Sequence, residues 1–112
     1  MESQNAIIKN VTMGLDERNN LVVSVEFAAH HFSNIYKFDL MEQMEVQRLA
    51  KLLEYAEVKN VEDLKGRMVR VMAFYKLFHG FGHPIEDKFV ATFGDTFMES
   101  TEEQFKKMIT EK

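Results

Sequence analysis

The chain has 112 residues, of which 46% are hydrophobic and 29% are charged, so its size and composition indicate one soluble globular domain over residues 1–112. It contains no cysteine, which excludes disulfides, zinc–thiolate centres and cysteine nucleophiles. Its 18 acidic and 14 basic residues give a formal net charge of −4, so the chain has no general attraction for nucleic acid.

No apolar run in the sequence approaches the ~20 residues that a membrane-spanning helix needs. The N-terminal segment MESQNAIIKN also lacks the pattern of a signal peptide. We therefore expect a cytoplasmic protein that makes no contact with a membrane.

Alternation of apolar and polar residues predicts three strands at the start of the chain. The first covers residues 6–15 and the second covers 21–29, with a polar turn at 16–20 between them. The third covers 35–40, after the segment HHFSN. Such short connections favour an antiparallel meander. The first strand places four apolar residues on one face, namely Ile7, Val11, Met13 and Leu15.

The period then changes to that of an amphipathic helix over residues 45–57. Its apolar stripe consists of Val46, Leu49, Ala50 and Leu53. We expect this helix to cover the apolar face of the meander, because an uncovered sheet face would be left in water.

The middle of the chain predicts a single helical turn and then a hairpin. Asn60 is suited to cap the turn, and Gly66 is suited to end it in the left-handed conformation. Two further strands are predicted over 67–75 and 77–83, joined by a tight hairpin near residues 74–76.

Residues 88–93 are a candidate edge strand, and a second helix is predicted over about 101–110. Ser100 and Glu103 have the spacing of a capping box at its start. Together these elements predict an α+β fold, with a twisted antiparallel sheet of about five strands and one helix packed on a face. The C-terminal helix is expected to dock on the sheet edge or to serve self-association.

The segment KLFHGFGHPIEDKF, residues 76–89, is the most unusual in the chain. An extended strand there would place Leu77, His79, Phe81 and His83 on one face, and Phe78, Gly80 and Gly82 on the other. His79 and His83 would then stand ~13 Å apart, too far for both to bind one metal ion. Gly80 and Gly82 would leave a shallow trough, either packed under a helix or open to a ligand, and we favour packing.

No nucleophile elbow and no phosphate-binding glycine loop occurs in the sequence. We therefore expect no catalytic residues, no cofactor and no metal site, and a binding protein rather than an enzyme. His30 and His31 lie in a predicted loop, where neighbouring side chains point opposite ways, so no joint role is expected. The sequence leaves open whether they meet His79 or His83 in space.

Five residues are the candidate contacts for an anionic ligand or a protein partner, namely Lys65, Arg67, Arg70, His79 and His83. The first three form the one basic-leaning stretch of the chain, for which a solvated strand edge is the alternative interpretation. Histidine serves as a donor or a base near neutral pH, which is why the two histidines are included.

Self-association is expected through the second face of the sheet, since a single covering helix leaves that face partly apolar. Met68 and Met72 flank Arg70 there, and the C-terminal helix offers Phe105 and Met108. Either this face forms a homodimer contact or the C-terminal helix covers it. We favour a homodimer, because symmetric dimers are the commonest oligomers.

The run VKNVEDLKGRMVRV at 58–71, followed by GFGHPIEDKF at 80–89, resembles a group of small, mostly uncharacterised phage and prophage proteins. The likeness covers roughly residues 6–93 and centres on an EDLKG-x-x-VRV segment. It departs at FAAHHFSN, residues 27–34, where members of the group carry a glycine-rich segment. The resemblance implies a viral or prophage origin, and small phage proteins of this kind often bind a host protein or a defence component.

These observations predict a non-catalytic accessory protein that binds and modulates a host protein, with an anti-CRISPR-like inhibitor of a defence effector as one form. The alternative is a small-ligand protein for a nucleotide or a metal, or a minor enzyme, that uses the trough at Gly80 and Gly82.

Overall fold

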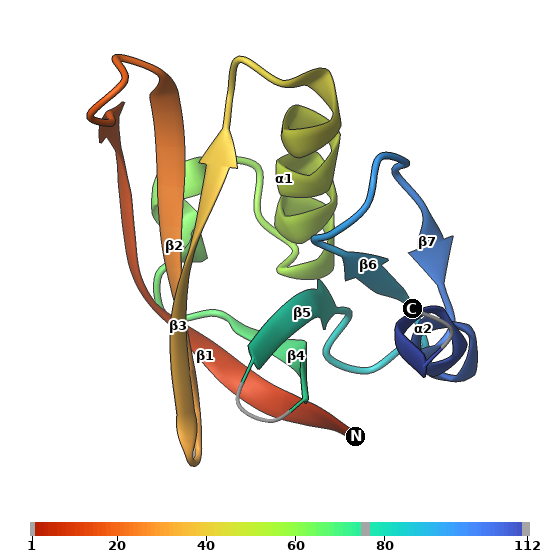
Figure 1. Ribbon diagram of the computed structural model, residues 1–112. Helices are drawn as coiled ribbons and strands as arrows, with labels where there is room; N and C mark the ends of the chain where they lie inside the picture. The colour runs from red at the N-terminus through yellow and green to blue at the C-terminus, as the bar shows by residue number, and fades with distance from the viewer. Residues whose placement is uncertain (1, 75–76, 111–112) are drawn as a thin grey trace.

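The computed structural model describes residues 2–74 and 77–110. Within these residues seven strands form one antiparallel sheet in the order β3-β2-β1-β4-β5-β6-β7, and two helices pack against it (Figure 1). The α+β class is confirmed, but the sheet has more strands than the five or so predicted. The predicted hairpin near residues 74–76 falls partly on residues 75–76, which lie outside the described part of the chain.

The strands are β1 (Glu2–Leu15), β2 (Leu21–Ala29), β3 (Phe32–Asp39), β4 (Met68–Phe74), β5 (Leu77–Gly82), β6 (Phe89–Ala91) and β7 (Glu99–Ser100). The helices are α1 (Gln43–Tyr55), the short 3-10 turn η1 (Val61–Leu64) and α2 (Glu102–Thr110). The sequence did not predict β7, because two residues are too few to show any period.

Strand β1 pairs with β4 through residues 2–7 and with β2 through residues 7–15. A bulge between Ile8 and Asn10 shifts its register against β2. Because one extra residue reverses the side-chain alternation, Ile7 and Val11 lie on opposite faces of the sheet. The prediction that they share a face is therefore wrong, and the buried residues of this segment are Ala6 and Ile8.

The main core lies in the hollow of the bent sheet, which α1 fills (Figure 1). Its largest buried side chains are Phe27, Phe38, Leu52, Tyr55 and Phe81. Of the stripe predicted for α1, Leu49 is buried as expected, whereas Val46 and Ala50 are exposed. Arg48 and Tyr55 also point inward, so the buried face of the helix is rotated about the helix axis relative to the predicted stripe.

Strand β5 contains a second bulge, at His79. Met72 of β4 lies opposite Gly80 and Ala73 lies opposite Phe78, which leaves His79 as the extra residue. Phe78 therefore packs into the main core, with its ring 5.1 Å from that of Phe27. The prediction that Phe78 shares a face with Gly80 and Gly82 is wrong for this reason.

Helix α2 packs on the other face of the sheet, where Met72, Phe89 and Phe105 form a smaller buried cluster. Its capping box is Thr101–Gln104, one residue beyond the predicted pair. Gln104 N donates to Thr101 Oγ1 at 3.2 Å, and Thr101 N donates to Gln104 Oε1 at 3.0 Å. Ser100 is not available as the cap because it pairs with Phe89 in β7.

The turn η1 joins α1 to β4 along the edge of β1. Gly66 has a φ of +88°, which confirms the left-handed conformation predicted for it. Asn60 stands at the N-cap, but its side chain forms no capping bond. Gly66 N donates to Ile8 O at 2.7 Å, so the turn is fixed to the sheet by backbone bonds.

Candidate functional site

Arg70, a predicted ligand contact, holds a loop of its own chain. Its Nε donates to His83 O at 2.7 Å, and its Nη2 donates to Glu86 O. The guanidinium also lies 4.8 Å from the centre of the Phe89 ring. These contacts fix the segment between β5 and β6 over the outer face of the sheet, and they use the Nε and Nη2 groups of Arg70 as donors.

His83 shapes the same loop from the other side. Its Nδ1 accepts hydrogen bonds from Ile85 N at 3.0 Å and Glu86 N at 2.9 Å, which requires an unprotonated Nδ1. Its ring meets that of Tyr55 edge-on at 5.7 Å. His83 is thus engaged in the local fold.

The remaining predicted contacts lie elsewhere. The His79 ring is half-buried, 6.4 Å from the Phe74 ring and 6.0 Å from the Phe93 ring. Lys65 and Arg67 are exposed in the segment before β4. Of the five predicted contacts, the structure therefore brings together only Arg70 and His83. Arg70, His83 and His79 all contact other parts of the chain itself.

The space above the two β5 glycines is filled by aromatic rings. A Cβ at Gly80 would lie 2.7 Å from the Phe105 ring and would also meet Val90 O. A Cβ at Gly82 would meet the Phe89 ring. The glycines permit close packing of the Phe105 and Phe89 rings on β5, which is the favoured interpretation of the trough.

The four residues predicted at a self-association contact differ in exposure. Met72 and Phe105 are fully buried in the cluster under α2, and Met108 is half-buried beside them. Only Met68 is well exposed, at 46%, and it pairs across the sheet with Ile7, which is exposed to the same extent. Helix α2 thus covers part of the face proposed for a dimer, and an uncovered part remains at Met68.

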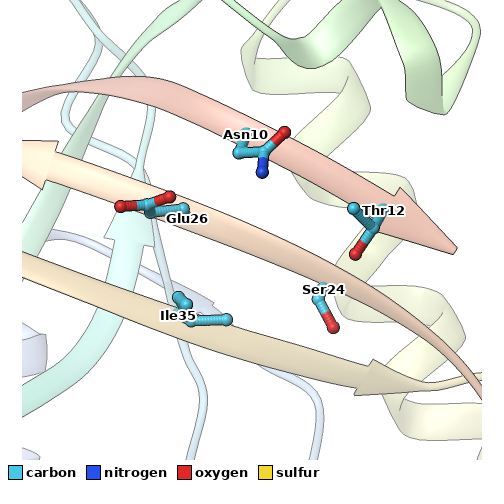
Figure 2. A pocket seen from close by; sticks show the side chains of 5 residues that line it. All are labelled: Asn10, Thr12, Ser24, Glu26 and Ile35. Carbon is cyan, nitrogen blue, oxygen red and sulfur yellow. The ribbon is translucent and has the colours of Figure 1, made fainter. Parts of the chain in front are cut away.

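A small hollow lies on the outer face of β1, β2 and β3, opposite the face that packs on α1. Its lining is Asn10, Thr12, Ser24, Glu26 and Ile35, whose side chains stand side by side on the three strands (Figure 2). The volume of about 50 Å³ suffices for one or a few water molecules and not for a metabolite.

A wider groove of about 410 Å³ lies at the start of α1. It is lined by Glu42, Gln43, Met44, Gln47, Asp95 and Phe97. Its two carboxylates and the lack of a basic side chain in its lining disfavour a phosphate-bearing ligand. This argues against the groove as a nucleotide site.

Sequence reasoning missed a buried polar network between α1, β3 and the segment after β6. The Tyr36 hydroxyl donates to the Glu45 carboxylate at 2.8 Å, and Arg48 Nη1 donates to the same group at 2.6 Å. Arg48 Nη2 also donates to the carbonyls of Phe93 and Gly94, at 3.0 and 3.1 Å. Burial, and the hydrogen bond to Glu45, raise the pKa of Tyr36, which keeps its hydroxyl protonated as a donor.

This network acts as a structural tie. It links β3, one edge of the sheet, to the segment that follows β6 near the other edge. Arg48 is only 3% exposed, so its charge is held among protein groups rather than offered to a ligand. The sequence did contain one signal of this network. Glu45 and Arg48 are three residues apart, on the helix face that carries Leu49, which is the spacing of an ion pair within a helix.

The strongest candidate for an interaction site is an apolar area at the end of the β1–β2 hairpin, at the upper left of Figure 1. It consists of Met13, Leu15, Leu21 and Met41, which are 64%, 68%, 38% and 71% exposed. We call it the hairpin-end patch. Leu15 lies directly opposite Leu21, and Leu21 O accepts a hydrogen bond from Leu40 N, the neighbour of Met41.

The turn beside the hairpin-end patch is fixed by Asp16. Its Oδ1 accepts hydrogen bonds from Arg18 N at 2.8 Å and Asn20 N at 2.9 Å. The hydrogen bond from Asn20 N has the largest effect and lowers the pKa of Asp16. The bond from Arg18 N lowers it further, and these effects outweigh the desolvation of the carboxylate. A fixed turn holds the backbone of the two flanking strands in place, which reduces the backbone entropy lost when a partner binds.

Within the described residues no three or more His, Asp or Glu side chains come together in a way that would hold a metal ion. His30 and His31 are therefore not joined by His79 or His83. None of the helices in this part of the chain is long and apolar enough to cross a membrane.

Neither a protein-family model nor a curated protein matches this sequence, so the resemblance to phage proteins stays a prediction.

Proposed function

We propose that this chain is a non-catalytic accessory protein that binds and modulates another protein, and that the hairpin-end patch is the centre of the contact. The observation that carries the proposal is the gathering of four exposed apolar side chains at one end of the sheet. Contiguous exposed apolar area usually marks an interface. The resemblance to phage proteins makes a host protein, such as a defence effector, the expected partner.

The patch has the composition of an interface core and the size of only a part of one. Methionine side chains adapt their shape to a partner surface and are enriched at such contacts. A specific interface covers about 800 Å² on each partner, with a few central residues contributing most of the binding free energy. The four residues would form that centre, surrounded by the polar turn at 16–20.

The charge of the chain disfavours a mechanism in which the protein imitates nucleic acid. A net charge of −4 is spread over both acidic and basic side chains, so imitation of nucleic-acid phosphates is not the expected mode of action. The small-ligand alternative would need the space above Gly80 and Gly82, where the rings of Phe105 and Phe89 lie.

The proposal is tested by affinity capture from host lysate with three forms of the chain: unmodified, Leu15→Ser and Ile35→Ser. Leu15 is 68% exposed in the patch on β1, and Ile35 of β3 is 59% exposed on the opposite face of the same sheet. We expect one protein to be captured at near-stoichiometric level by the unmodified chain and by Ile35→Ser, and to be lost with Leu15→Ser. Capture that survives Leu15→Ser, or capture of nothing by the unmodified chain, contradicts the proposal.

A further inference from the structure

The connection between β2 and β3 consists of two histidines. Ala29 lies opposite Phe32 as the last pair of the two strands, so His30 and His31 form the whole turn. The expectation that their side chains point in opposite directions is wrong. In a two-residue turn the chain reverses between the two residues instead of extending, and the ring centres lie 4.1 Å apart.

Both rings are accessible. His30 and His31 are exposed, and the turn projects away from the rest of the chain at the bottom of Figure 1. The structure shows no hydrogen bond or ion pair from either ring to another side chain among the described residues, so the ring nitrogens are available to a ligand.

We propose that His30 and His31 form a two-imidazole site for a divalent transition-metal ion. Neutral imidazole nitrogen is a strong ligand for Cu²⁺, Zn²⁺ and Ni²⁺, at about 2.0–2.1 Å for zinc. Two nitrogens bound to one ion at neighbouring positions stand roughly 3 Å apart. The ring centres of His30 and His31 lie 4.1 Å apart, and rotation about the side-chain torsion angles can turn one nitrogen of each ring towards a shared ion.

The type and the number of its ligands determine which metal ions the site binds. Both ligands are nitrogen, which disfavours Mg²⁺ and Ca²⁺, because those ions take oxygen ligands. Affinity for nitrogen ligands rises towards Cu²⁺ and falls again at Zn²⁺, so Cu²⁺ is expected to bind more tightly than Zn²⁺. The described residues supply no third ligand, and water completes the coordination.

The turn suits this role because the backbone already positions both ligands. Pairing of Ala28 with Ser33 and of Ala29 with Phe32 fixes the turn on each side. Binding therefore costs little ordering of the chain beyond the two side chains. Protons compete with the metal for the same nitrogens, so binding weakens as the pH falls.

The test is isothermal titration of the full chain with Cu²⁺, Zn²⁺ and Mg²⁺ near neutral pH. We expect binding of one Cu²⁺ per chain, weaker binding of Zn²⁺ and none of Mg²⁺. His30→Ala and His31→Ala should each weaken Cu²⁺ binding by at least about tenfold, as the loss of even an indirect support for a metal ligand does. Ser33→Ala, an exposed change in the same hairpin, should leave it unaltered.

His79 and His83 remain in every variant, so the double variant His30→Ala/His31→Ala identifies the site. Cu²⁺ binding retained by the double variant overturns the proposal. Amide NMR signals give an independent readout, because Cu²⁺ broadens signals close to it. Broadening centred on residues 29–32 supports the site, and broadening centred on residues 79–83 overturns it. Unchanged melting temperatures show that the variants remain folded.

Discussion

The ring of Phe105 lies 2.7 Å from the point where a Cβ would stand at Gly80, so helix α2 packs against bare backbone. A residue of any other type at this position would push α2 away from the sheet and strain the pairing of β5 with β6. The close approach explains why a strand interior carries glycine despite its entropic cost. It also makes a sharp prediction about stability.

Gly80→Ala should lower the free energy of unfolding by about 1–3 kcal/mol, the range for overpacking a close-packed site. The added methyl group would meet both the Phe105 ring and Val90 O, and the latter belongs to backbone that cannot rotate away. Urea unfolding measures the loss. Gly14→Ala is the matched control, since a Cβ there has nothing within 4 Å, and it should not lower stability.

Met72→Lys should unfold the chain more readily, not dissociate a dimer, because Met72 is fully buried between the sheet and α2. Loss of a buried methionine side chain alone costs about 2–5 kcal/mol, and an unpaired charge adds to that cost. Urea unfolding measures the change. Stability within about 0.5 kcal/mol of the unmodified chain, the range for a surface position, would show that α2 does not cover this residue.

Met68→Lys is the matched change on the exposed part of the same strand. It should leave stability nearly unchanged and should dissociate a homodimer formed through the outer face at Met68 and Ile7, which we predict. Light scattering should then report a fall to the mass of one chain, 13.1 kDa. A mass of 13.1 kDa for the unmodified chain at micromolar concentration contradicts self-association.

Arg48→Met should cost about 3 kcal/mol or more, because it removes one partner of a buried ion pair and leaves two carbonyls without a donor. Hydrogen exchange should rise locally at residues 92–94, which the guanidinium holds. Lys51→Met is the control on the same helix, since Lys51 forms its ion pairs near the surface, and it should cost about 1 kcal/mol or less. Equal losses in the two variants would contradict a special role for Arg48.

Stability at acid pH should depend on Glu99. The hydrogen bond from the Tyr55 hydroxyl lowers the pKa of Glu99, and Lys51 adds to the effect. Because the folded-state pKa lies below the unfolded value, the contribution is fully present above the unfolded value of about 4.3. It is lost as the pH falls through the folded-state value.

Glu99→Gln should therefore flatten the curve of unfolding free energy against pH below about pH 5. Chemical unfolding at a series of pH values measures the slope. Glu103→Gln serves as the control, because its side chain is 84% exposed and its lysine partner is 3.9 Å away. Parallel curves for the unmodified chain and Glu99→Gln would refute the assignment.

Local periodicity was enough to predict the meander and the position of α1, and the glycine after a single helical turn predicted the left-handed conformation at Gly66. It failed at the bulges beside Ile8 and at His79, because a single extra residue reverses alternation and is chosen by pairing with a distant strand. The rotation of α1 also escaped prediction. Arg48 points inward only because the carbonyls of Phe93 and Gly94 are brought next to it by the fold.

The candidate site was harder to predict than the fold. Leu15 and Leu21 fall in step with the apolar residues at every second position of their strands, so their pattern predicts burial. In the structure they are exposed, at 68% and 38%. The sequence analysis selected Arg70 and His83 for their chemistry. In the structure both hold the loop at residues 83–86, and the bond from Arg70 joins parts of the sequence that local patterns do not connect.

The change of partner along β1 has a consequence for how the chain folds. Among the described strands β1 alone is hydrogen-bonded to both the N-terminal meander and the C-terminal strands, and Ile7 has Ala28 on one side and Met68 on the other. The pairing with Ala28 closes a short stretch of chain, whereas the pairing with Met68 closes more than half of it. Since the entropy lost on closure grows with loop length, we expect the meander to form first and β1 then to be the strand to which β4 is added.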